Sequence, residues 1–105
     1  MTVKRPDHVL VGPYRYAIRW DAGSSDRENY GVVRHSQLTV AVDPNIAADM
    51  QASTLLHEIL HCVWKVGGNI QGKVTEEEAV SLLEPVLLDT LRRNPAVVAF
   101  LLGGR

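Results

Sequence analysis

A His-Glu-x-x-His pattern occurs inside a stretch with the apolar spacing of a helix, TLLHEILHCVW at residues 54–64. On a helix, His57 and His61 lie about 40° apart on one face, so both imidazoles can reach a single metal ion. Glu58 lies one step further round the helix, where its carboxylate can take a proton from water held by the metal. The pattern therefore predicts a helix that carries the centre of a zinc hydrolase.

The competing interpretation of this stretch is a solvated polar helix face. His57, Glu58 and His61 fall outside one broad apolar arc of the predicted helix, so they are not expected to be core residues. The arc comprises Ala48, Ala52, Leu55, Leu56, Ile59, Leu60, Cys62, Val63 and Val66. Because Cys62 lies in the arc, we expect it to be a small buried hydrophobe and not a ligand or a nucleophile.

Composition limits the size and class of the protein. With 105 residues, 46% hydrophobic and 22% charged, the chain suits a single small domain over residues 1–105. A formal net charge of −1 offers no basic surface for nucleic acid. The apolar run near the start, at residues 9–11, is too short for a signal peptide, and no stretch reaches membrane length. One cysteine cannot form an internal disulfide, so we expect a cytoplasmic protein without a membrane partner.

The first half of the chain is predicted to form strands. Residues 14–20 alternate aromatic or β-branched residues with Arg15, Ala17 and Arg19, the period of a sheet with one buried face. A polar loop is expected at 21–29, followed by a hairpin of two strands at 30–35 and 37–42. The pattern favours a small antiparallel sheet of about three strands.

The second half is predicted to be helical. The motif helix is expected over about 46–66, capped by Asp43 or Asn45 and ended by Gly67-Gly68. A second helix is expected to begin with a capping box of Thr75 and Glu78 and to bend or split at Pro85. Asn94-Pro95 should end it before a last apolar turn at 96–102. The whole pattern predicts an α+β fold.

A catalytic zinc usually has three protein ligands, so one more donor is expected besides the two histidines. The acidic run Glu76, Glu77 and Glu78 opens the second helix and offers three candidates, among which spacing alone does not choose. A capping-box glutamate would turn back to its own helix end, which counts against Glu78. His35 and His8 are weaker candidates, because a lone histidine is more often structural or exposed.

The motif and the residues after it resemble the ImmA/IrrE-type zinc metallopeptidases, especially compact phage-encoded zincin-like proteins. The resemblance covers roughly residues 30–95 and includes Glu78-Ala79, Leu82-Leu83 and Val86-Leu87. It implies a minimal zincin-like domain in which His57, His61 and Glu78 bind one zinc ion and Glu58 is the general base. The chain departs from the family where Val80 replaces the asparagine of Glu-Ala-Asn and where Pro85 comes early.

The resemblance implies a zinc-dependent endopeptidase that acts on a protein or peptide, in the host cytoplasm if a phage encodes it, with a regulatory protein as a possible partner. We expect an extended substrate to pair with the strand at 37–42. The sequence identifies no second oxyanion donor, although Tyr30 or His35 could serve if the hairpin folds over the cleft. The alternative is a catalytically silent zincin-like binding or regulatory module. Glu58 argues for the enzyme, since a structural zinc site needs no base.

Overall fold

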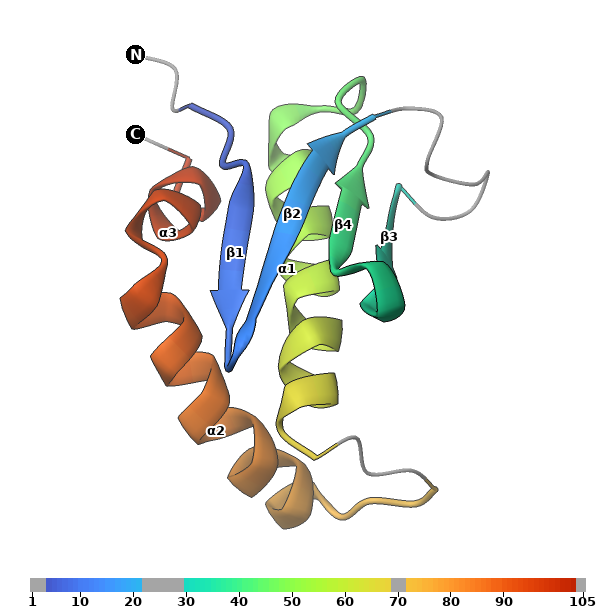
Figure 1. Cartoon of the computed structure of the whole chain (residues 1–105), viewed down its shortest axis with the longest axis vertical. Coiled ribbons are helices and arrows are strands. Elements are labelled where there is room, and N and C mark those ends of the chain that lie inside the picture. Colours follow the sequence, from blue (N-terminus) through green and yellow to red (C-terminus); the bar gives the residue numbers. More distant parts are fainter. Residues whose placement is uncertain (1–3, 22–29, 69–71, 104–105) are drawn as a thin grey trace.

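The computed structural model describes residues 4–21, 30–68 and 72–103, and has an α+β architecture with a four-stranded sheet followed by three helices (Figure 1). The predicted fold class is confirmed, although most of the predicted loop, 22–29, lies outside the described residues. In chain order the elements are β1 (His8–Val11), β2 (Tyr14–Trp20), β3 (Gly31–Arg34), the short 3-10 helix η2 (His35–Gln37), β4 (Thr39–Val42), α1 (Ala48–Val66), α2 (Glu76–Arg93) and α3 (Pro95–Leu101).

The sheet has the strand order β1-β2-β4-β3 and is mixed. β1 and β2 form an antiparallel hairpin, as do β3 and β4, so the predicted hairpin is confirmed. The prediction of about three antiparallel strands is wrong in two respects. β1, whose apolar run is confined to residues 9–11, was missed, and β2 and β4 run parallel, with Ile18 opposite Val40. The parallel pair arises because β3 carries the chain back before β4 begins.

Helix α1 covers one face of the sheet, and the core lies between them (Figure 1). Tyr16 and Ile18 of β2 are buried, whereas Arg15 before them and Arg19 after them are exposed, as the two-residue period of a strand requires. The buried core consists of Val9, Val11, Tyr16, Ile18, Val40, Val42, Leu55, Ile59, Cys62, Val63 and Val97.

The turn between β1 and β2 packs against the end of α1 at a glycine. Gly12 has a φ of +56°, and a Cβ there would lie 2.5 Å from Cγ1 of Val66. Both the left-handed backbone and the close approach require glycine. This contact fixes the sheet against the C-terminal turn of the motif helix.

The motif helix begins two residues later than predicted and without the expected side-chain cap. The Asp43 carboxylate accepts a hydrogen bond from the backbone N–H of Asn45 in the preceding turn, and Ala47 is the N-cap residue. The Gln51 side chain instead donates to the carbonyl oxygens of Pro44 and Ile46, which ties the helix to the end of β4. The helix ends at Val66 with Gly67 as its C-cap residue, as predicted.

Helices α2 and α3 line the edge of the sheet formed by β1 (Figure 1). Thr75 is the N-cap residue, as predicted, and its Oγ1 accepts from the Glu78 backbone N–H. The second half of the predicted capping box differs, because the Glu78 carboxylate accepts from the Thr75 hydroxyl and not from the Thr75 backbone N–H. Pro85 does not split α2, which continues to Arg93. Among the described residues, no helix is both long and apolar enough to cross a membrane.

Asn94 joins the helical half of the chain to the sheet. Its side chain is 5% exposed, accepts from the Leu10 backbone N–H at 2.8 Å and donates to the Leu10 carbonyl oxygen at 2.8 Å. It also donates to the Thr90 carbonyl oxygen at 2.7 Å. One amide thus holds β1 and the C-terminal turn of α2 together.

We predict that Asn94→Ala lowers the free energy of unfolding by about 2–3 kcal/mol, because it leaves part-buried backbone groups of Leu10 without their side-chain partner and removes a buried bond to Thr90. Urea unfolding followed by circular dichroism measures the change. Asn45→Ala is the matched control, since Asn45 is exposed, and it should shift the free energy by less than about 0.5 kcal/mol. Equal effects of the two substitutions would show that Asn94 does not join β1 to α2.

We predict that the thiol of Cys62 resists alkylation in the folded protein. Burial raises its pKa to about 12, and the charge of Glu58 acts in the same direction. At about pH 8, iodoacetamide should modify the urea-unfolded chain, whose thiol has an ordinary pKa, and leave the native chain unmodified over the same time. Mass spectrometry measures the difference, and equally rapid labelling of the native chain would contradict it.

Candidate metal centre

The three residues of the motif lie on the side of α1 that faces β3. They share a pocket of about 260 Å³ with β3 and the start of η2. The lining residues are Gly31, Val32, Val33, His35, His57, Glu58 and His61. One wall of the pocket is therefore the motif helix, and the other is the outermost strand of the sheet.

The two histidines of the motif are close enough to share one ion. Their Nε2 atoms lie 3.3 Å apart, the ring planes meet at 74°, and both side chains are exposed. Two nitrogens bound tetrahedrally to zinc at about 2.0–2.1 Å are separated by about 3.3–3.4 Å. Without an ion, one ring can donate a hydrogen bond to the other across the same distance. The spacing of His57 and His61 thus fits a zinc ion.

Glu58 completes a group of three potential ligands. The ligand atoms of His57, Glu58 and His61 all lie within 4.8 Å of one another, so this group could hold a metal ion. Burial raises the pKa of the Glu58 carboxyl, while the two neighbouring histidines act to lower it. A carboxylate with a raised pKa accepts a proton more readily than an exposed one.

The burial of Glu58, which is 6% exposed, differs from the prediction that it lies outside the buried arc. The cause is β3, which passes close to α1 at Gly31. A Cβ on Gly31 would lie 2.8 Å from Thr54 Cγ2 and 3.2 Å from Glu58 Cγ. Only a residue without a side chain allows the strand to approach this closely, and the strand then covers the carboxylate.

On the side of the apolar arc away from Glu58, burial also differs from the prediction. Leu56 is 39% exposed and Leu60 is 36% exposed, although both were expected to be buried. The sheet covers only one side of α1, and α2 contacts it near its C-terminal end, where a Cβ on Gly67 would meet Leu82. Leu56 and Leu60 lie outside the contact of α1 with the sheet and outside its contact with α2. The predicted apolar arc is therefore too wide on this side and too narrow on the side of Glu58.

Glu78 does not belong to the group of potential ligands. It lies in the first turn of α2, where its carboxylate accepts a hydrogen bond from Thr75. α2 packs against α1 and β1, whereas the two histidines share a pocket with β3 at the opposite edge of the sheet. Glu76 and Glu77 lie in the same exposed turn. The role of Glu78 as a third zinc ligand stays a prediction from the resemblance.

His35 lines the pocket, although its surroundings in the sequence offer little reason to single it out. Its Nδ1 atom lies 3.1 Å from the hydroxyl oxygen of Tyr16, and the two rings meet edge to face. Burial lowers the pKa of the imidazole, and so do the charges of Lys65 and His61, which favours the neutral ring. The sequence feature that could have pointed to His35 as a site residue is its position at the turn of the predicted hairpin, which precedes the motif helix.

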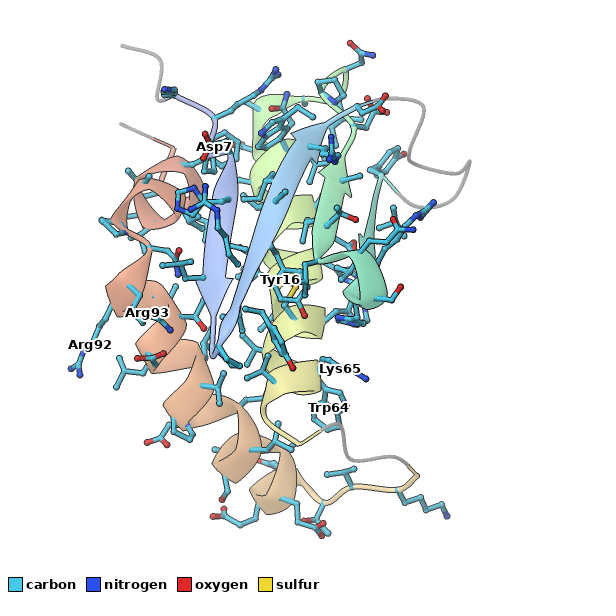
Figure 2. The ribbon with its side chains drawn as sticks, in the orientation of Figure 1. Asp7, Tyr16, Trp64, Lys65, Arg92 and Arg93 are labelled. Atoms are coloured by element: carbon cyan, nitrogen blue, oxygen red, sulfur yellow. The ribbon has the colours of Figure 1, made fainter. Side chains whose placement is uncertain are left out.

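The other candidates from the sequence lie outside the pocket. His8 pairs with Asp7 at 2.7 Å on β1, and Tyr30 is exposed and is not a lining residue. Figure 2 shows Tyr16 on β2 and Lys65 near the end of α1, two of the residues that act on His35.

Comparison with known proteins adds no relatives. No family model, no curated protein and no solved structure matches this chain. The resemblance to the ImmA/IrrE-type metallopeptidases therefore rests on the motif and the second helix alone and stays a prediction.

Proposed function

We propose that the protein is a zinc-dependent metallopeptidase that hydrolyses peptide bonds of a protein substrate. The observation that carries the proposal is the pair of Nε2 atoms of His57 and His61, 3.3 Å apart, beside the buried carboxylate of Glu58. The two imidazoles suit zinc better than magnesium or calcium, which prefer oxygen ligands alone, and Glu58 is kept as the base. The exposed edges of the histidines leave room for a substrate.

The proposed chemistry divides between the ion and Glu58. A zinc ion held by His57 and His61 would lower the pKa of water and polarise a carbonyl group. Glu58 takes one proton from the water that attacks the peptide carbon and then delivers a proton to the leaving amine as the C–N bond breaks. Burial beneath β3 keeps this carboxylate next to the histidines and raises its pKa, which suits both steps.

The substrate would lie along β3 and not along β4. The sequence favoured the strand at 37–42, but β4 has β2 on one side and β3 on the other, so its backbone groups are already paired. β3 is the last strand of the sheet in the described part of the chain, and Gly31, Val32 and Val33 line the pocket. An extended peptide added to β3 would pass the two histidines with its backbone hydrogen-bonded to the strand.

We predict that Glu58→Gln keeps zinc binding and lowers zinc-dependent peptide cleavage at least about 100-fold, because the amide cannot take the proton. Mass spectrometry of a mixed peptide library incubated with the zinc-loaded protein detects the new chain ends, and elemental analysis measures the zinc. Glu84→Gln is the matched control, an exposed glutamate on α2, and should cleave as the wild type does.

The same measurement tests the alternative of a silent module. Cleavage by Glu58→Gln at the rate of the wild type would exclude Glu58 as the base. If the zinc-loaded wild type produced no new chain ends, the protein would be a zinc-binding module without peptidase activity, and the proposal would fail.

A further inference from the structure

His35 stands in the wall of the pocket opposite the motif helix and is held there from the core. It is the first residue of η2, directly after β3. Its Nδ1 atom contacts the hydroxyl oxygen of Tyr16 at 3.1 Å, and Tyr16 is only 1% exposed. A side chain that the core orients toward a pocket with two histidines and a buried carboxylate has a fixed relation to whatever binds there.

The hydrogen bond behind His35 bears on which of its nitrogens carries the hydrogen. Nδ1 lies 3.1 Å from the hydroxyl oxygen of Tyr16. Burial raises the pKa of this hydroxyl to about 12, so it keeps its hydrogen at neutral pH. When the hydroxyl donates that hydrogen to Nδ1 of the neutral ring, Nε2 carries the N–H.

The position of His35 fits a contact with the substrate better than a contact with the ion. Its ring nitrogens do not belong to the group of ligand atoms within 4.8 Å that His57, Glu58 and His61 form. It nevertheless lines the same pocket and is close enough to His61 for the charge of that ring to affect its pKa. A peptide group bound between β3 and the motif helix would lie in the pocket that His35 lines.

We propose that His35 is a catalytic residue, whose Nε2–H donates a hydrogen bond to the carbonyl oxygen of the scissile peptide bond as that oxygen becomes negatively charged. This inference rests on the proposed peptidase function and adds the second donor that hydrolysis of a peptide bond needs. Tyr16 is a positioning residue, which acts only through the orientation of the His35 ring.

Methylphosphonate binding to the cobalt-loaded protein tests the inference without a known substrate. The probe is a small tetrahedral anion that resembles the hydrated peptide carbonyl, and cobalt gives a visible absorption that reports its binding. His35→Ala should weaken probe binding at least about tenfold and leave cobalt affinity unchanged. His35→Gln can place an amide N–H near the same point and should bind the probe within about threefold of the wild type.

Two further variants separate orientation from a general loss of structure. Tyr16→Phe should weaken probe binding less than His35→Ala does, because the ring remains but is no longer held. His8→Ala is the matched control, a histidine on β1 outside the pocket, and should change nothing. Thermal unfolding followed by circular dichroism shows that each variant is folded under the conditions of the titration.

The outcomes distinguish this inference from the proposed function. If wild type and His35→Ala bind the probe equally, or if the cobalt-loaded wild type binds no probe, His35 is not the donor although the metal site stands. If His35→Ala loses cobalt, His35 is a ligand and the inference is overturned. If the wild type binds no cobalt, the proposed function fails and the inference fails with it.

Discussion

The close approach of β3 to α1 at Gly31 is the contact on which the candidate site depends. It places a strand across the motif helix, buries the Glu58 carboxylate and closes one side of the pocket. Without this contact, Glu58 would be an exposed glutamate on a helix surface with an ordinary pKa. Burial costs stability when the carboxylate is charged, and the two adjacent histidines, or an ion between them, offset part of that cost.

One helix serves both the core and the site. Leu55, Ile59, Cys62 and Val63 face the sheet and are buried, while His57 and His61 point outward a fraction of a turn away. Rigid packing on one face therefore holds the histidines at a fixed spacing on the other. Cys62 links the two functions, because its thiol contacts Tyr16, which in turn holds His35 at the pocket.

The sequence was sufficient for features that depend on local spacing. The helix that carries His57 and His61, the N-cap at Thr75 and the β3–β4 hairpin all arise from patterns within a few residues, and the structure agrees. Features that depend on distant contacts could not be predicted. The burial of Glu58 requires Gly31, and the role suggested for His35 requires Tyr16, nineteen residues away on another strand. The strand order that puts α2 and the histidines at opposite edges was equally hidden.

Calorimetric titration with zinc tests the central claim, that His57 and His61 form a metal site, most directly. We expect the wild type to bind one zinc ion per chain, and His57→Ala and His61→Ala each to lose at least about 100-fold in affinity, with His8→Ala unchanged as the control. Glu78→Ala in the same series tests whether α2 also supplies a ligand. Absence of zinc binding by the wild type, or undiminished affinity in both histidine variants, would contradict the account.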